Sequence, residues 1–177
     1  MAAGSLVVLL RGVNVGGHRT FRPAALVREL GHLGAVNIGA AGTFVIRERV
    51  SQAALRSELA ARLPFETEIM ICPGRDVTRL MALEPFARHA ARPDIVPFVS
   101  LLARAPKTLP PMPLNFPATG AWMLTVIGRE QRFVFGLYRR EMKAVGYLGT
   151  LDRAFGVPVT TRNWNTISAI ARVVAGG

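Results

Sequence analysis

Cysteine is almost absent from this chain of 177 residues, and histidine is sparse. Cys72 is the only cysteine, which excludes an intrachain disulfide and a zinc site built on cysteines. Its apolar neighbours within 69–73 favour a buried strand residue over a reactive nucleophile. The three histidines, His18, His32 and His89, are too dispersed to suggest metal ligation. We therefore assign no metal ligands.

Linear signatures of catalysis are also lacking. The chain has no Ser-His-Asp arrangement, no His-Glu-x-x-His motif and no paired-carboxylate spacing. It has neither the Lys-Ser/Thr ending of a Walker loop nor the G-x-G-x-x-G spacing of a dinucleotide-binding loop, so no cofactor is indicated. Residues distant in sequence still converge in a fold, and an enzyme of unknown reaction therefore stays open.

Long hydrophobic segments are missing as well. The first apolar run, 6–10, is too short for a secretory signal and lacks a basic leader. The stretch 108–128 carries no charge, but it contains four prolines, which exclude a spanning helix. We expect a cytoplasmic protein with no membrane partner.

Acidic residues are outnumbered two to one by basic ones. There are 22 Lys and Arg against 11 Asp and Glu, a formal net charge of +11, and Lys107 and Lys143 are the only lysines. A guanidinium binds two phosphate oxygens at once, so the excess favours acidic partners such as phosphate or nucleic acid. Genomic composition bias toward arginine predicts the same excess. Only Arg139 and Arg140 are adjacent, and such scattered charge argues against a stripe that binds a duplex.

The apolar pattern predicts the α+β class with two lobes, 1–91 and 92–177. In the first lobe we expect strands at 5–11, 36–38, 44–46 and 66–72. One helix follows Pro23 and another follows a cap at Ser51. The order βαββαβ is that of ferredoxin-like domains. A further helix is expected at 76–83.

The second lobe is expected to be a smaller mixed α/β lobe with an antiparallel hairpin. A strand at 95–103 precedes a proline-rich loop, and strands 121–127 and 132–138 form the hairpin. A helix at 148–155 and an extended segment at 158–161 lead to a last helix capped by Asn165 or Thr166. Alternate residues of 133–137 share one face, which favours a strand facing the core over an RNA-binding strand.

The first candidate site is the loop that follows the first strand. It contains Arg11, Gly12, Asn14, Gly16 and Gly17. Glycine permits positive φ, so successive N–H groups can converge on an anion, to which an arginine adds a two-pronged contact and an asparagine a donor or acceptor. A tight strand-to-helix connection that needs glycine only for its turns explains the same residues.

The second candidate site is the stretch 160–166, TTRNWNT, directly before the last helix. It supplies Arg162, Asn163 and Asn165 beside a helix N-terminus, whose free N–H groups and positive end suit an oxyanion. The alternative is an elaborate cap, in which Trp164 packs in the core and the small polar side chains satisfy backbone donors.

Together, LLRGVNVGG at 9–17 and TTRNWNT at 160–166 resemble the two ends of an uncharacterised bacterial family, DUF1697. The resemblance covers nearly the whole chain and implies a two-lobed α+β protein with a ferredoxin-like first half, without any assigned activity. The family's usual Gln-Ser-Gly-Asn turn is Ala-Ala-Gly-Thr here, so Thr43 stands where an Asn is usual. If that turn binds a ligand in relatives, this chain binds something else or nothing there.

The leading hypothesis is a binding module. The two motifs would meet in an inter-lobe cleft lined by Arg and Asn and hold a phosphate-bearing small molecule or a nucleotide. A nucleic-acid-binding protein acting through the arginine surplus, an enzyme using the same cleft, and purely structural motifs that lock the lobes together are the alternatives. The sequence indicates neither the ligand nor the oligomeric state.

Overall fold

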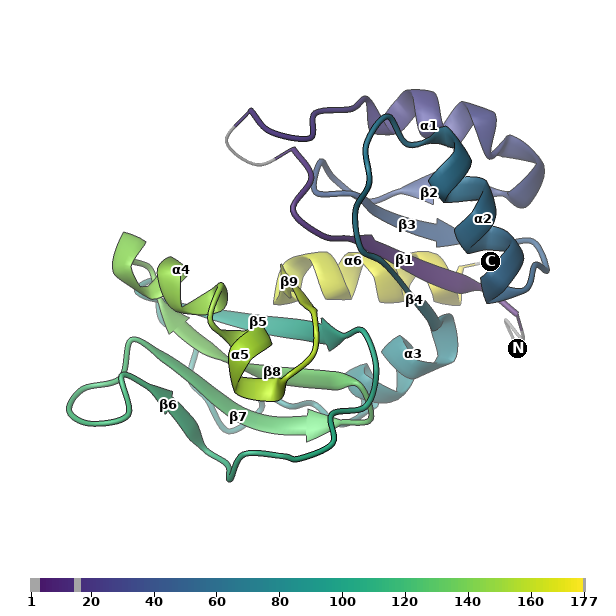
Figure 1. Ribbon diagram of the computed structural model, residues 1–177. Helices are drawn as coiled ribbons and strands as arrows, with labels where there is room; N and C mark the ends of the chain where they lie inside the picture. The colour runs from purple at the N-terminus through teal and green to yellow at the C-terminus, as the bar shows by residue number, and fades with distance from the viewer. Residues whose placement is uncertain (1–3, 15–16, 177) are drawn as a thin grey trace. The chain divides into compact units, whose positions relative to one another are not determined.

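The computed structural model describes residues 4–14 and 17–176 (Figure 1), so the expected site residue Gly16 lies outside the described residues. Two antiparallel sheets and six α-helices give the α+β class that the sequence predicts. The chain divides into two units, Met1–Ala82 with Thr166–Gly177, and Leu83–Asn165. This division differs from the expected lobes 1–91 and 92–177 in two places: residues 83–91 belong to the second unit, and most of the last helix belongs to the first.

The first unit has the expected βαββαβ order. Its sheet order is β2-β3-β1-β4 with every neighbouring pair antiparallel, the order of a split βαβ arrangement. The elements are β1 (Leu6–Leu10), α1 (Pro23–Glu29), the short 3₁₀ helix η1 (Gly31–Leu33), β2 (Ala35–Asn37), β3 (Thr43–Ile46), α2 (Gln52–Arg62) and β4 (Ile69–Pro73).

Strand β1 is the centre of this unit. All five of its residues are buried, as its unbroken apolar run predicts for a strand covered on both faces. Leu6, Val8 and Leu10 join a core that takes its other residues from α1, α2 and the neighbouring strands. Helices α1 and α2 therefore cover that face of the sheet (Figure 1). The expected cap of α2 is confirmed, because Ser51 Oγ accepts a hydrogen bond from Ala54 N–H at 3.1 Å.

The end of the chain returns to this first unit. Helix α3 (Gly74–Ala82) begins at Gly74, where a Cβ would lie 3.0 Å from Val174 Cγ1 of α6 (Trp164–Ala175). This close approach explains why the last helix belongs with the first half. The expected caps of α6 are wrong: the helix begins at Trp164, so Asn165 and Thr166 lie inside its first turn.

The second unit contains a five-stranded antiparallel sheet of order β6-β7-β8-β5-β9. The expected hairpin is present as the β7–β8 pair. The elements are β5 (Ile95–Leu102), β6 (Leu114–Phe116), β7 (Leu124–Glu130), β8 (Phe133–Arg139), α4 (Met142–Leu148), α5 (Leu151–Phe155) and β9 (Val159–Asn163). None of the helices in the described parts of the chain is long and apolar enough to cross a membrane.

Two elements of this unit differ from the expectation. Strand β6 lies inside the stretch expected to be a proline-rich loop, where prolines flank its three residues. Helix α4 buries only Ala144 and leaves Met142 88% exposed, so it lacks the apolar stripe that predicts a helix. The sequence analysis therefore did not expect α4, and the expected helix at 148–155 is present as the shorter α5. On β8, Phe133 and Leu137 are buried as expected, whereas Phe135 is only half-buried.

Two glycines in the turn between β2 and β3 provide a matched test of packing. Gly42 and Gly39 both have positive φ, +73° and +70°. A Cβ at Gly42 would come within 2.6 Å of Val13 Cγ2 and 2.8 Å of Leu10 Cβ, whereas a Cβ at Gly39 would meet nothing within 4 Å. Both changes to alanine incur the strain of the left-handed region, about 1–2 kcal/mol. Only the first also overpacks a core, which costs about 1–3 kcal/mol more.

We therefore expect Gly42→Ala to destabilise the protein by about 2 kcal/mol more than Gly39→Ala. Urea unfolding of the full chain, followed by far-UV circular dichroism, measures the difference. Equal midpoints for the two variants would show that Val13 does not pack against this turn as described.

Candidate functional site

The loop after β1 is attached to the segment that precedes β4. Arg11 N–H donates to the Glu68 carbonyl at 3.1 Å, and Thr67 Oγ1 donates to the Arg11 carbonyl at 2.5 Å. Both contacts continue the register of the sheet, in which Leu10 pairs with Ile69. The pairing of β1 with β4 thus fixes where the Arg11 backbone leaves the sheet.

Asn14 holds the loop itself in shape. Its Nδ2 donates to the Ala40 carbonyl at 2.8 Å, and its Oδ1 accepts from Phe21 N–H at 3.0 Å. Its backbone lies in the left-handed region, with φ 53°, which asparagine tolerates better than most residues. Asn14 therefore connects the loop to the β2–β3 turn and to the start of α1. Its contact with a ligand stays a prediction.

The loop borders an open pocket of about 620 Å³ within the first unit. Its lining residues are Arg11, Gly12, Arg19, Glu66, Thr67 and Glu68. Sequence reasoning found Arg11 and Gly12 but missed the other four. Pairing the first and fourth strands at Leu10 and Ile69 would have placed 66–68 beside the loop, but no local signal in the sequence gives that register.

The glycines of the loop have the expected conformation where they are described. Gly12 and Gly17 have φ values of +63° and +77°, which favour glycine. Thr43 is fully buried on β3 opposite Leu9. A ligand contact by Thr43 stays a prediction.

The second motif lies on the strand β9 and the start of α6. Arg162 is only 8% exposed, and its Nη1 donates to Thr160 Oγ1 at 3.0 Å and to the Thr161 carbonyl at 2.8 Å. Burial lowers the pKa of Arg162 to about 10, so the side chain is still a cation at neutral pH. Asn163 and Asn165 are exposed.

Neighbouring side chains hold this motif in place. Thr161 Oγ1 and Ser100 Oγ of β5 share a hydrogen bond of 2.6 Å across the β5–β9 pair. The Trp164 ring meets Phe86 edge to face, with centroids 5.0 Å apart. Packing of Trp164 against an aromatic residue agrees with the structural alternative for this motif. Arg11 belongs to the first unit and Arg162 to the second, and the expectation that they share a cleft stays a prediction.

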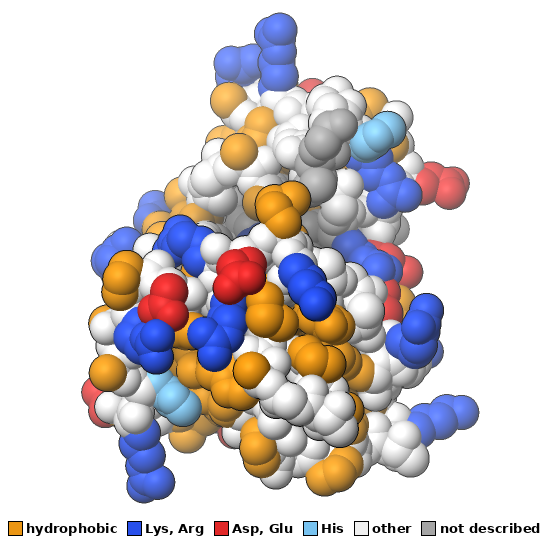
Figure 2. Space-filling model, turned by 90° about the vertical axis from the view of Figure 1, so that its left-hand side faces the viewer, with side chains coloured by type: hydrophobic (Ala, Val, Ile, Leu, Met, Phe, Trp, Pro, Cys, Tyr) orange, Lys and Arg blue, Asp and Glu red, His pale blue; other side chains and the backbone are white. Residues whose placement is uncertain are grey.

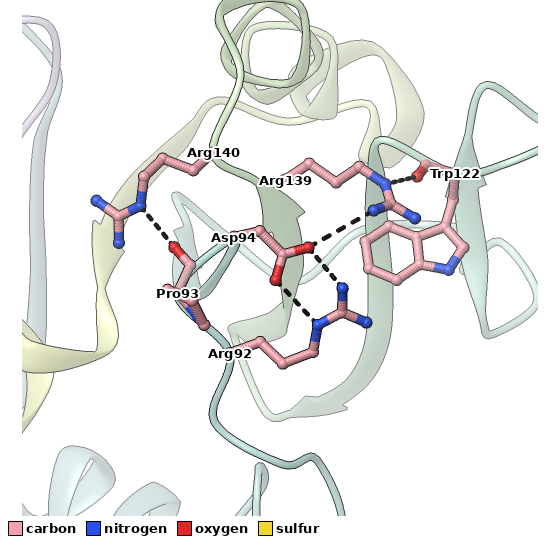
Figure 3. Close-up of polar contacts among 6 residues, drawn as sticks. All are labelled: Arg92, Pro93, Asp94, Trp122, Arg139 and Arg140. Atoms are coloured by element: carbon pink, nitrogen blue, oxygen red, sulfur yellow. Dashed lines mark hydrogen bonds and ion pairs between the residues drawn. The ribbon is translucent and has the colours of Figure 1, made fainter.

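A third polar cluster was not expected from the sequence (Figure 3). Asp94 accepts two hydrogen bonds from Arg92, at 2.9 Å from Nε and 2.6 Å from Nη2. Arg139 Nη1 lies 3.9 Å from the same carboxylate, and the Arg139 guanidinium lies over the Trp122 ring at 4.9 Å. Arg140 Nε donates to the Pro93 carbonyl at 3.1 Å. These contacts fasten the segment before β5 to the end of β8.

Charge on the face shown in Figure 2 is dispersed. Figure 2 shows Lys and Arg side chains spread among hydrophobic and uncharged ones over the visible face, with acidic side chains between them. Among the described residues, no group of three or more His, Cys, Asp or Glu side chains is placed to hold a metal ion.

Asn14 should be a determinant of stability. Asn14→Ala removes two hydrogen bonds, worth about 1 kcal/mol each, and replaces asparagine by a residue that tolerates positive φ less well. We expect a loss of about 2–3 kcal/mol. Asn14→Gly removes the same bonds without backbone strain and should cost about 1 kcal/mol less. Urea unfolding measures both, and a wild-type midpoint for Asn14→Ala would contradict this role.

Asp94 should make stability depend on pH. Its hydrogen bonds with Arg92 hold the pKa of the carboxyl below the ordinary value of 3.8. A depressed folded-state pKa means that the contribution is present above about pH 4 and is lost as pH falls through the folded-state pKa. Asp94→Asn should therefore lower the melting temperature at pH 6, and its deficit should shrink toward pH 3.

The matched control is Glu48→Gln, which removes one negative charge at an exposed position. Its difference from the wild-type protein should change less with pH than that of Asp94→Asn. A constant deficit for Asp94→Asn from pH 6 to pH 3 would show that ionisation of Asp94 does not contribute to stability.

Comparison with known proteins gives a family model and a fold. The model described as "Protein of unknown function (DUF1697)" matches residues 4–111, a range that includes the first motif but not the second. The structure of the conserved bacterial protein SP0830 from Streptococcus pneumoniae is similar, with a TM-score of 0.62 and 16% identity over 96% of this chain and 98% of that one. At this identity the likeness shows the fold alone. No curated protein matches significantly.

Proposed function

This chain belongs to the DUF1697 family of proteins of unknown function, and from its own residues we propose that it binds a phosphate-bearing small molecule or a nucleotide in the pocket beside Arg11. The observation that carries the proposal is the pairing of two arginines, Arg11 and Arg19, with the glycine backbone of Gly12 around one open pocket. Guanidinium groups bind phosphate oxygens in pairs, and a glycine lets the backbone approach an anion closely.

The acidic residues of the pocket narrow the kind of ligand. Glu66 and Glu68 balance the charges of Arg11 and Arg19, so the lining carries no net charge. A bare polyanion would face two carboxylates, whereas hydroxyl or amino groups donate hydrogen bonds to them. A sugar phosphate or a nucleotide carries both kinds of group. A volume of about 620 Å³ is within the usual range of small-molecule sites.

Neutral lining also weighs against the nucleic-acid alternative at this pocket. Duplex and single-stranded nucleic acids are held mainly by uncompensated cations along their phosphates. Here each arginine is matched by a glutamate, and the surface charge in Figure 2 is dispersed. A discrete ligand of mixed polarity therefore suits this pocket better than a phosphate backbone does.

The same two carboxylates favour a second candidate, an enzyme acting in this pocket. A carboxylate within reach of a bound hydroxyl or water is a candidate general base. Release of inorganic phosphate from a bound nucleotide, stopped by Glu68→Gln without loss of binding, would distinguish turnover from binding alone.

Removal of the Arg11 side chain should weaken the binding of phosphate-bearing probes. The probes are adenosine 5′-monophosphate, ribose 5-phosphate, inorganic phosphate and, as the neutral counterpart, adenosine. We expect Arg11→Ala to reduce affinity for the first two about 10- to 100-fold, the loss of one charge-assisted contact of about 1.5–3 kcal/mol. Thermal shift and calorimetric titration of the full chain measure this change.

The matched control is Arg28→Ala, which removes an exposed arginine of α1 outside the pocket lining and should leave affinity unchanged. Equal losses for Arg11→Ala and Arg28→Ala would overturn the proposal. The expected participation of Arg162, Asn163 and Asn165 is tested by a double-mutant cycle of Arg11→Ala with Arg162→Lys. A coupling above about 0.5 kcal/mol supports one shared ligand, and additive losses exclude it.

A further inference from the structure

The segment 83–89 of the second unit forms the rim of a pocket. Two successive turns hold it: Ala87 N–H donates to the Glu84 carbonyl, and His89 N–H donates to the Phe86 carbonyl, both at 2.9 Å. Glu84 has φ 45°, a conformation that is strained for a side chain of this kind. Phe86 anchors the segment by edge-to-face contact with Phe135 of β8, with centroids 6.1 Å apart.

The sheet contributes Ile127 and Phe135 to this pocket, and Ile127 lies at an irregularity in β7. The β7–β8 register shifts between Val126 and Gly128, so Ile127 is an extra residue in its strand. Such bulges change the direction of side chains and are frequent beside functional sites. A Cβ at Gly128 would lie 2.6 Å from Phe135 Cε2, so only glycine there leaves room for the Phe135 ring.

Rim and sheet border an open pocket of about 410 Å³ that lies wholly within the second unit. Its apolar residues are Leu83, Pro85, Ala87, Ile127 and Phe135, and its charged or titratable ones are Glu84, Arg88 and His89. Leu83 is 49% exposed. The volume is in the range of small-ligand pockets. Five of the eight lining residues are apolar, while the polar atoms contribute more of the exposed lining surface.

The charges of the lining select the ligand chemistry. A simple anion would gain a contact with Arg88 and face repulsion from Glu84, and a simple cation would do the reverse. A neutral apolar molecule would leave both groups without a partner while it desolvated them. A zwitterion with an apolar side chain matches the positive charge of Arg88, the negative charge of Glu84 and the apolar residues of the lining.

We infer that this pocket binds an apolar α-amino acid. Its carboxylate pairs with Arg88, its ammonium group pairs with Glu84, and its side chain lies against Ile127 and Phe135. His89 adds a further hydrogen-bonding group at the rim. The site is separate from the phosphate pocket, which is lined only by residues of the first unit.

The probe is L-phenylalanine, titrated into the ¹⁵N-labelled full chain and followed by amide chemical shifts. N-acetyl-L-phenylalanine lacks the ammonium group, and L-phenylalaninamide lacks the carboxylate, so the pair separates the two ionic contacts. The amides of 83–89 and of Ile127 should shift on addition of L-phenylalanine. Each analogue should bind about two- to fivefold more weakly, as expected when one exposed ion pair is lost.

A variant that removes one charge of the pocket should affect only those probes that carry the opposite charge. Arg88→Ala should weaken L-phenylalanine and N-acetyl-L-phenylalanine about two- to fivefold and leave L-phenylalaninamide unchanged. Glu84→Gln should weaken L-phenylalanine and L-phenylalaninamide and leave N-acetyl-L-phenylalanine unchanged. Arg104→Ala and Glu48→Gln, at exposed positions outside the lining, should alter none of the three affinities.

The apolar contact has an equally matched control. Leu83 and Leu109 have the same exposed fraction, 49%, but only Leu83 lines the pocket. Leu83→Ser should weaken all three probes, and Leu109→Ser should weaken none. The inference is overturned if L-phenylalanine shifts no amide of 83–89, or if Leu83→Ser and Arg88→Ala act no more strongly than their controls. The amide shifts report on this pocket alone, and none of these variants changes a residue of the phosphate pocket. The result therefore does not depend on the proposed function.

Discussion

The pairing of β1 with β4 is the constraint on which the candidate site depends. Strand β1 is buried throughout, and its side chains pack closely on both faces in the register that pairs it with β4. That register places Leu10 opposite Ile69, and the next step along each strand brings Arg11 beside Glu68. A shift of one residue would turn the buried side chains of β1 to the opposite faces and move Arg11 away from the carboxylates. The pocket is therefore a consequence of core packing at the end of a strand.

Much of the first unit could be predicted because its signals are local. Pro23, the apolar spacing of Leu26 and Leu30, and the cap at Ser51 each determine an element within a few residues. The order of those elements then restricts the topology to a known arrangement. Local chemistry also identified Arg11 and Gly12 as pocket residues, since a glycine-rich loop after a buried strand is a local feature.

The features that could not be predicted depend on contacts between distant residues. Gly74 accommodates Val174 across 100 positions of sequence, which is why the last helix belongs to the first unit. The sequence places Glu66 and Glu68 at the start of an expected strand and does not indicate their place in a pocket, because that place depends on the register of β4. Trp164 begins α6 directly after β9, so the cap expected at Asn165 had no room to form. In each case, tertiary packing decided between local alternatives of similar cost.

The two pockets change the interpretation of the arginine surplus. Each pocket lining contains as many glutamates as arginines: Arg11, Arg19, Glu66 and Glu68 in the first unit, and Arg88 and Glu84 in the second. The formal charge of +11 is therefore carried largely by arginines outside both linings. Opposite charges in one lining reduce the repulsion between like groups inside a concave site. They also favour ligands that carry both a positive and a negative charge, or an anionic group together with hydrogen-bond donors. Specificity in this protein would then come from the arrangement of opposite charges within each pocket, while the net charge sets only the general attraction of the surface for anions.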